Sequence, residues 1–182
     1  MENEGIIKVQ PNDIIAEQAV LGSMLVDKDA VIAAIEMLKP DDFYREDNKE
    51  IYAAMLELYN LGKPIDMITL KEQLILRTTL EKVGGISYIA TLIDTVPTTS
   101  NIENYVKIVE EKSVLRNLIK TANDIIKLGY EGSEEVDTVI EQTEKKIFDL
   151  VQNRNSRGYA SIKEVLISTF DELEKKFQNF WN

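Results

Sequence analysis

The sequence predicts an all-α protein: a small multi-helix globular head, then a long antiparallel helical hairpin and a separate linker helix. Apolar residues recur at spacings of three and four through most of the chain, which is the period of an amphipathic helix. Pairs with the spacing of a capping box, in which two side chains satisfy free N–H groups of the first turn, recur between these stretches. No stretch alternates apolar and polar residues as a half-buried strand does.

Residues 1–100 are predicted to form the head, starting with two short helices. Asn12 or Asp13 can cap the first helix, which runs to about Val26. Asp29 begins the second, which runs to about Leu38.

Three further helices complete the head. Asp47 with Glu50, and Thr69 with Glu72, have capping-box spacing and predict two helix starts. The segment GGISYIATLIDTV, which begins at Gly84, predicts a short apolar helix before the head ends near Pro97.

Residues 101–154 are predicted to form the hairpin. Ser100 and Glu103 have capping-box spacing, so a long helix should begin near Asn101 and stop at Gly129 in a left-handed conformation. Ser133 can cap a second long helix. Because the intervening turn is short, the two helices should run antiparallel.

The apolar stripe of the hairpin is wider than one neighbouring helix needs. Part of it can pack within the hairpin and part on a second chain, so the sequence predicts self-association. The residues expected at that interface are Leu115, Leu118, Ile119, Ala122, Ile126, Ile140 and Ile147.

Basic side chains gather on the first hairpin helix. Residues 101–128 carry 5 basic and 4 acidic side chains, whereas the rest of the chain is acidic. Lys112, Arg116, Lys120 and Lys127 lie near one another on the helix surface. They form either a solvated face or a surface for an acidic partner.

Residues 155–160 are predicted to be a flexible linker, because QNRNSRGYA is polar and contains glycine. Residues 161–182 are predicted to form an amphipathic helix, which is marginal in water unless it packs on something. It can fold back on the hairpin or dock on another chain. Its docking face would contain Ile162, Leu166, Phe170, Leu173 and Phe177.

Composition excludes several classes of function. The chain of 182 residues has no cysteine and no histidine, which removes thiolate nucleophiles and the usual base at neutral pH. Its net charge of -11 opposes binding to nucleic acid. No stretch approaches the roughly 20 apolar residues that span a bilayer, and a cytoplasmic location without membrane contact is expected.

No catalytic, cofactor-binding or metal-ligating residues are predicted. None of the eight glycines lies in a G-x-x-x-x-G-K-[ST] phosphate loop. Gly84 and Gly85 suit a turn between helices better than an anion site. The carboxylate pairs Asp41/Asp42 and Glu134/Glu135 fall at predicted helix starts, where negative charge is favourable. The sequence therefore points to a protein-interaction role.

Several blocks of sequence, in order, resemble a known family. They are AEQAVLG at 16–22, DFY at 42–44, GG with SY at 84–88, and the stretch from Pro97 to Arg116. Over roughly residues 10–180 the chain closely resembles the N-terminal domain of the bacterial replicative DNA helicase, the DnaB family. That family often has a histidine shortly after its DFY block, where this chain has Asn48.

The resemblance implies a collar domain that forms dimers and then a hexameric ring, and that recruits the C-terminal helical domain of primase. A helicase loader is a further candidate partner. Tyr88, Glu17 and Arg116 are candidate primase-binding residues. The linker helix would dock on the neighbouring subunit's motor domain. That RecA-like motor, with ATP and Mg, would follow residue 182.

Two other interpretations remain open at this point. The helicase-binding domain of primase also combines a small helical head with a hairpin, although the AEQAVLG block and the linker helix argue against it. A free-standing acidic helical adaptor is the alternative from another class.

Overall fold

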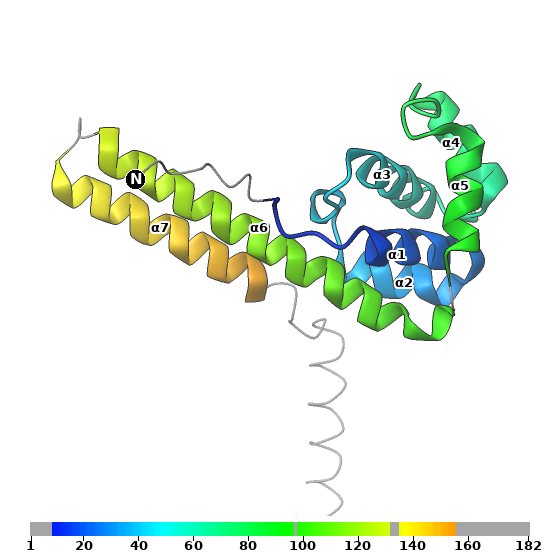
Figure 1. Ribbon diagram of the computed structural model, residues 1–182, viewed down its shortest axis with the longest axis horizontal. Coiled ribbons are helices and arrows are strands. Elements are labelled where there is room, and N and C mark those ends of the chain that lie inside the picture. Colours follow the sequence, from blue (N-terminus) through cyan, green and yellow to red (C-terminus); the bar gives the residue numbers. More distant parts are fainter. Residues whose placement is uncertain (1–8, 97, 132–134, 156–182) are drawn as a thin grey trace, which may run out of the picture. The chain divides into compact units, whose positions relative to one another are not determined.

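The computed structural model describes residues 9–96, 98–131 and 135–155 (Figure 1). Over these ranges the secondary structure is helical and contains no β-strand, as the sequence predicts. The helices are α1 (Ile14–Val26), α2 (Lys28–Met37), α3 (Glu46–Asn60), α4 (Met67–Leu76), α5 (Gly85–Asp94), α6 (Ile102–Glu131) and α7 (Val136–Asn155). Two 3₁₀ turns, η1 (Pro40–Asp42) and η2 (Thr99–Asn101), precede α3 and α6.

The chain divides into two compact units, Met1–Asp124 and Ile125–Asn182. In the first unit α1 packs against α2, α3 and α5, and α4 packs against α3 and α5. Figure 1 shows α1 among the other helices of this unit. The division of the chain into a head, a dimerising hairpin and a linker remains a prediction.

The start of α1 agrees with the sequence. Asp13 is the cap, and its carboxylate accepts a hydrogen bond of 2.9 Å from the N–H of Ala16. Asp27 follows the last residue of α1 and also caps α2, which begins at Lys28, one residue before the expected start at Asp29. Only one residue joins the two helices, so α2 folds directly back on α1.

The other predicted caps are wrong in detail. Arg45 precedes α3 without a side-chain cap, so Asp47 and Glu50 already lie inside the helix. Asp66 caps α4, and the reciprocal partner is Thr69. The spacing rule identified the regions of the helix starts but not the capping residues, because several polar residues near each start have suitable side chains.

The long helix α6 begins at Ile102, one residue after the predicted start. The predicted cap is wrong, because Ser100 lies within the 3₁₀ turn η2, where its N–H donates to the hydroxyl of Thr98, the residue that caps that turn. The predicted stop at Gly129 is also wrong, since the helix continues through that glycine to Glu131. Ser133 lies outside the described residues.

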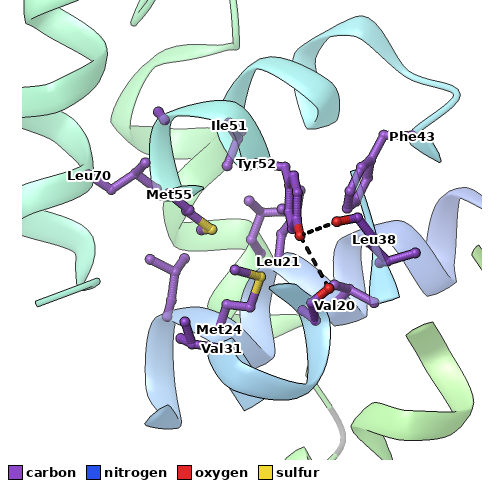
Figure 2. Packing of buried hydrophobic residues seen from close by; sticks show 14 of the residues in the cluster. Val20, Leu21, Met24, Val31, Leu38, Phe43, Ile51, Tyr52, Met55 and Leu70 are labelled. Atoms are coloured by element: carbon purple, nitrogen blue, oxygen red, sulfur yellow. Dashed lines mark hydrogen bonds between the residues drawn. The ribbon is translucent and has the colours of Figure 1, made fainter. Parts of the chain in front are cut away.

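The core of the first unit is a continuous apolar cluster to which helices α1 to α6 contribute (Figure 2). Tyr52 on α3 lies fully inside it, and its hydroxyl donates to the carbonyls of Ala34 (3.2 Å) and Leu38 (3.0 Å). Burial raises the pKa of this hydroxyl, so Tyr52 stays a neutral donor. The first turns of α6 complete the cluster through Val106 and Val109.

Gly22 allows α1 to lie very close to the end of α5. A Cβ atom at this position would lie 2.0 Å from the carbonyl oxygen of Leu92 and 2.4 Å from a methyl carbon of Val96. Only a residue without a side chain permits this contact. Among the described residues no helix is long and apolar enough to cross a membrane.

Candidate protein-interaction site

The predicted residue Tyr88 lies on α5 at the edge of the head, half-buried. Its hydroxyl donates to the side-chain oxygen of Asn48 at 2.7 Å and accepts from the amide of Gln18 at 3.1 Å. The guanidinium of Arg45 lies 5.3 Å from the centre of its ring. Burial raises the pKa of Tyr88, so the hydroxyl stays protonated at neutral pH.

Glu17, the second candidate, lies inside the head with 1% of its surface exposed. Its carboxylate accepts hydrogen bonds from the N–H of Tyr44 (2.7 Å), the N–H of Arg45 (3.4 Å) and the amide of Asn48 (2.9 Å). It thereby caps the segment that leads into α3. A buried carboxylate needs such donors, because burial without them is costly.

Together these hydrogen bonds form one network that links three helices. Gln18 and Glu17 come from α1, Asn48 from α3 and Tyr88 from α5. The half-exposed ring of Tyr88 is therefore held by a buried carboxylate through one amide side chain. The sequence drew attention to Asn48 only as the position of the family's histidine and did not connect it or Gln18 with this network, because an amide in a helix carries no motif that tells which face it lies on.

Arg116, the third candidate, anchors α6 to the loop before α3. Its guanidinium donates to the carbonyls of Pro11 (2.8 Å) and Asp42 and lies 5.7 Å from the centre of the Tyr44 ring. One turn earlier the buried hydroxyl of Ser113 donates to the buried Asp42 carboxylate at 2.6 Å. Burial lowers the pKa of Arg116 from its usual value, although the nearby acidic groups of Glu17 and Asp42 oppose that shift.

The residues predicted for self-association leave apolar surface exposed. The six larger ones are between 42% and 54% exposed, and Ala122 is exposed too. Their numbering on α6 (115, 118, 119, 122, 126) and on α7 (140, 147) puts them in one stripe on each helix. Val136 (73%), Phe148 (60%) and Val151 (50%) extend the exposed apolar surface of α7.

A neighbouring strip on each helix is half-buried. On α6 it contains Val114, Ile125 and Leu128, and on α7 it contains Val139 and Leu150. Each helix therefore has more apolar surface than the described part of the chain covers. The predicted docking residues of the linker helix, from Ile162 to Phe177, lie outside the described residues.

The described ranges contain no group of three or more acidic side chains that could hold a metal ion. Asp41, half of one carboxylate pair, forms an ion pair of 2.6 Å with Lys49, whose hydrogen bond and charge lower the pKa of Asp41. Its neighbour Asp42 accepts bonds from the N–H of Lys39 and from Ser113. In this part of the chain the candidate carboxylates serve the fold.

Known proteins similar to this chain were found by three comparisons. The family model described as the DnaB-like helicase N terminal domain matches residues 9–111. Replicative DNA helicase DnaB of Geobacillus stearothermophilus is 42% identical over 167 residues, 92% of this chain and 37% of that protein. Replicative DNA helicase DnaC of Bacillus subtilis is 45% identical over 168 residues, again 92% of this chain and 37% of that protein.

Solved structures agree with these relatives. The N-terminal domain of DnaB helicase from Mycobacterium tuberculosis has a TM-score of 0.74 and 41% identity, over 78% of this chain and 99% of that domain. A DnaB-like replicative helicase, solved in a study of its interactions with primase, has a TM-score of 0.65 at 23% identity, and supports the fold alone. The match covers 89% of this chain and 35% of the chain of that helicase.

The chain spans little more than a third of the length of the curated relatives that it matches. The family model and the relatives named above are those of replicative helicases. The family match covers residues 9–111, which contain the Glu17, Asn48 and Tyr88 network and the buried first turns of α6. This chain belongs to the DnaB-like helicase N-terminal domain family.

Proposed function

We propose that the chain is the collar domain of a bacterial, cytoplasmic replicative helicase, which assembles with further copies of itself into a ring and recruits primase. The catalytic motor, with ATP and Mg, would follow residue 182, and the linker helix of 161–182 would dock on the motor of a neighbouring subunit. The relatives support this, since their names describe replicative helicases and they extend well beyond the matched part.

The exposed apolar surface of α6 and α7 is the observation that carries the self-association. Seven residues of these stripes lie on the long helices α6 and α7, and an apolar surface of this kind in a monomer marks an interaction site. A second copy offers the same stripes, so a symmetric pair would cover both at once. Dimers of this kind would be the units from which a hexamer is built.

The test places a charge in the stripe. Ile119→Asp or Ile126→Asp should dissociate the dimer and leave the helix content unchanged, because an unpaired carboxylate in an apolar interface costs several kcal/mol. Sedimentation and light scattering would measure the mass, and circular dichroism the helix content. Asn117→Asp, at an exposed position of α6 outside the stripe, is the matched control.

Two results would overturn this proposal. One is a wild-type chain that stays monomeric at millimolar concentration. The other is an Ile119→Asp variant that associates as strongly as the control.

Primase recruitment through Tyr88 is the second part of the proposal. The ring of Tyr88 is partly exposed and held at the edge of the head by bonds to Asn48 and Gln18, so it offers a preorganised aromatic contact. Primase is the partner that we propose, because a helicase of the same fold was solved in a study of its interactions with primase. Glu17 and Arg116 enter the proposal as supports of this surface: Glu17 holds Asn48, and Arg116 holds the loop at Asp42 and Tyr44.

Calorimetry of the assembled chain with its cognate primase C-terminal domain would test this part. Tyr88→Ala should weaken binding by about 2 kcal/mol, the size expected of an aromatic residue at the centre of an interface. Tyr88→Phe keeps the ring and removes the hydroxyl, and it should retain most of the affinity. If the assembled wild-type chain does not bind primase, the partner is wrong; if folded Tyr88→Ala binds normally, only the position is wrong.

A further inference from the structure

A hollow lined by apolar side chains lies between the turn from α1 to α2 and the loop from α3 to α4. Its volume is about 640 Å³, and ligand sites in proteins have volumes of roughly 300–1,000 Å³. Its apolar lining includes the buried side chains of Met24, Leu25 and Val31 and the exposed side chains of Val26, Ile32 and Tyr59. This part of the head therefore combines exposed apolar surface with space that can receive side chains of another molecule.

The hollow is separate from the two surfaces proposed above. None of the described residues that line it comes from α6 or α7. Val26 follows Gln18 by 8 residues on α1, and Tyr59 follows Asn48 by 11 residues on α3. At 1.5 Å per residue, these positions are about 12 Å and 16 Å along the helices from the network that holds Tyr88. The hollow is therefore a third surface of the chain.

The loop after α3 is fixed by its own backbone hydrogen bonds. The N–H of Gly62 donates to the carbonyl of Tyr59 at 2.9 Å, and the N–H of Lys63 donates to the carbonyl of Leu58 at 3.0 Å. These two bonds, with a φ of 65° at Gly62, form the Schellman motif that ends α3. An extended peptide adds to the edge of a sheet, and the described residues contain no strand, so a helix is the segment suited to this hollow.

Two lysines carry the charge that the hollow offers to a partner. Lys28 and Lys63 line it, are exposed and form no ion pair with any described residue. Asp27 and Asp66 also line it, but each carboxylate accepts N–H groups from the first turn of α2 or α4 at 2.9 Å. The positive end of each helix offsets that negative charge. A partner with carboxylates at the border of its apolar face therefore fits better than a basic partner.

We propose that this hollow is a docking groove for a helix of a partner protein, apolar on one face and acidic beside that face. The apolar side chains of the partner helix enter the hollow beside Ile32 and Tyr59, and its carboxylates pair with Lys28 and Lys63. The apolar contacts supply the affinity, as in other grooves that bind amphipathic helices. The lysines select the partner, because a chain with a net charge of -11 repels acidic proteins over most of its surface.

A peptide library tests the proposal without assuming the identity of the partner. The library displays peptides of about 18 residues, or five helical turns, with leucine fixed at spacings of three and four and all other positions random. Peptides that bind the Ile32→Asp variant are removed first, because a carboxylate in the hollow opposes apolar burial. Peptides that then bind the wild-type chain should be enriched in Asp and Glu next to the leucines.

Fluorescence anisotropy with synthetic copies of the selected peptides measures the contribution of each side chain. Ile32→Asp and the double variant Lys28→Glu/Lys63→Glu should each raise the Kd about tenfold or more at low salt. The effect of the double variant should shrink as salt is added, because exposed charges are screened over about 8 Å at physiological ionic strength. The effect of Ile32→Asp should persist in salt, since most of it comes from lost apolar contact.

Each variant has a matched control outside the hollow. Ile75 on α4 is 50% exposed, against 47% for Ile32, so Ile75→Asp makes the same change at similar exposure. Lys82→Glu/Lys107→Glu makes the same change in net charge at two other exposed lysines. Both controls should bind the peptides as wild type does. Circular dichroism and urea denaturation verify that every variant is folded.

Four results would overturn the proposal. The library could yield no peptide that distinguishes wild type from Ile32→Asp, or only peptides with basic or uncharged residues next to the leucines. Ile32→Asp could reduce self-association in light scattering, in which case a second copy covers the hollow. A synthetic peptide of residues 161–182 is the last probe: if it binds wild type and loses affinity for Ile32→Asp but not for Ile75→Asp, the occupant is a segment of this chain.

Discussion

Gly22 and Gly129 show how one residue type serves opposite purposes. At Gly22 a Cβ would lie 2.0 Å from the carbonyl oxygen of Leu92, whereas at Gly129 nothing would lie within 4 Å. Both glycines are inside helices, where glycine costs backbone entropy. At Gly22 the close approach of helices compensates for that cost, and at Gly129 no contact does so.

Alanine at these two positions should therefore have opposite effects. Gly22→Ala should lower the free energy of unfolding by about 1–3 kcal/mol, because backbone or the side chain of Val96 must move. Gly129→Ala should raise it by up to about 1 kcal/mol through helix propensity. Urea denaturation followed by circular dichroism measures both, and a tolerated alanine at Gly22 would contradict the close approach.

At this scale the sequence predicted the local cap at Asp13 but not the surroundings of the buried side chains. Asp13 was identified as a cap because a cap is local, decided by a residue and the next turn. The burial of Glu17 and its bond to Asn48, 31 positions later, could not be predicted, since no local pattern tells which helix will cover a carboxylate. The stop assigned to Gly129 failed because glycine only permits a left-handed end.

At the scale of elements, ion pairs between side chains link α3 and α4. Arg77 at the end of α4 pairs with Glu50 (2.8 Å) and with Glu57, both on α3. Gln73 adds a hydrogen bond of 2.7 Å to Glu57. The Arg77 hydrogen bond lowers the pKa of Glu50, and burial partly opposes it.

This pairing makes part of the stability depend on pH. Because the pKa of Glu50 is lower in the folded chain than the ordinary value of 4.5, its contribution is present above pH 4.5 and is lost as the pH falls through the folded pKa. Glu50→Gln should therefore reduce the free energy of unfolding most at pH 7. The difference from wild type should shrink as the solution is acidified towards pH 3.

Chemical denaturation at a series of pH values between 7 and 3 measures this. Glu72→Gln, on the exposed side of α4, is the control and should run parallel to wild type. A Glu50→Gln difference that stays constant over the whole series would mean that the pair adds no pH-dependent stability.

The order of the elements could be predicted from periodicity, because each helix carries its own apolar period and the turns between helices are short. The five head helices and the long α6 agree with that order. Their partners could not be predicted in the same way. The contact of Ser113 with Asp42, 71 positions apart, depends on how α6 lies on the head, and a serine in a helix gives no sign of such a bond.

For the whole molecule the balance of charge decides what the chain can approach. With 32 acidic and 21 basic residues it repels phosphate backbones, and the run of basic residues on α6 is short. A chain without a phosphate-binding loop also lacks the usual means of holding a nucleotide. The sequence therefore predicts little direct contact of this chain with nucleotide or DNA.

The isolated chain should neither hydrolyse ATP nor bind single-stranded DNA tightly. Its Kd for a labelled oligonucleotide should stay above 1 µM at about 150 mM salt, because few phosphate contacts are available. Fluorescence anisotropy and a coupled phosphate assay measure the two activities, with a full-length replicative DNA helicase as the positive control. Saturable turnover at a fixed stoichiometry would contradict the interaction role.

The buried position of Glu17 has a consequence for genetics. A screen for variants that fail to recruit a partner would recover substitutions at Glu17 and Arg116 together with those at Tyr88. The first two would score through a disturbed loop, since one holds the N–H groups of Tyr44 and Arg45 and the other holds the carbonyl of Asp42. Allele-specific suppressors would separate the classes: compensating changes for Tyr88 should map to the partner's gene, and those for Glu17 to neighbouring codons of the same chain.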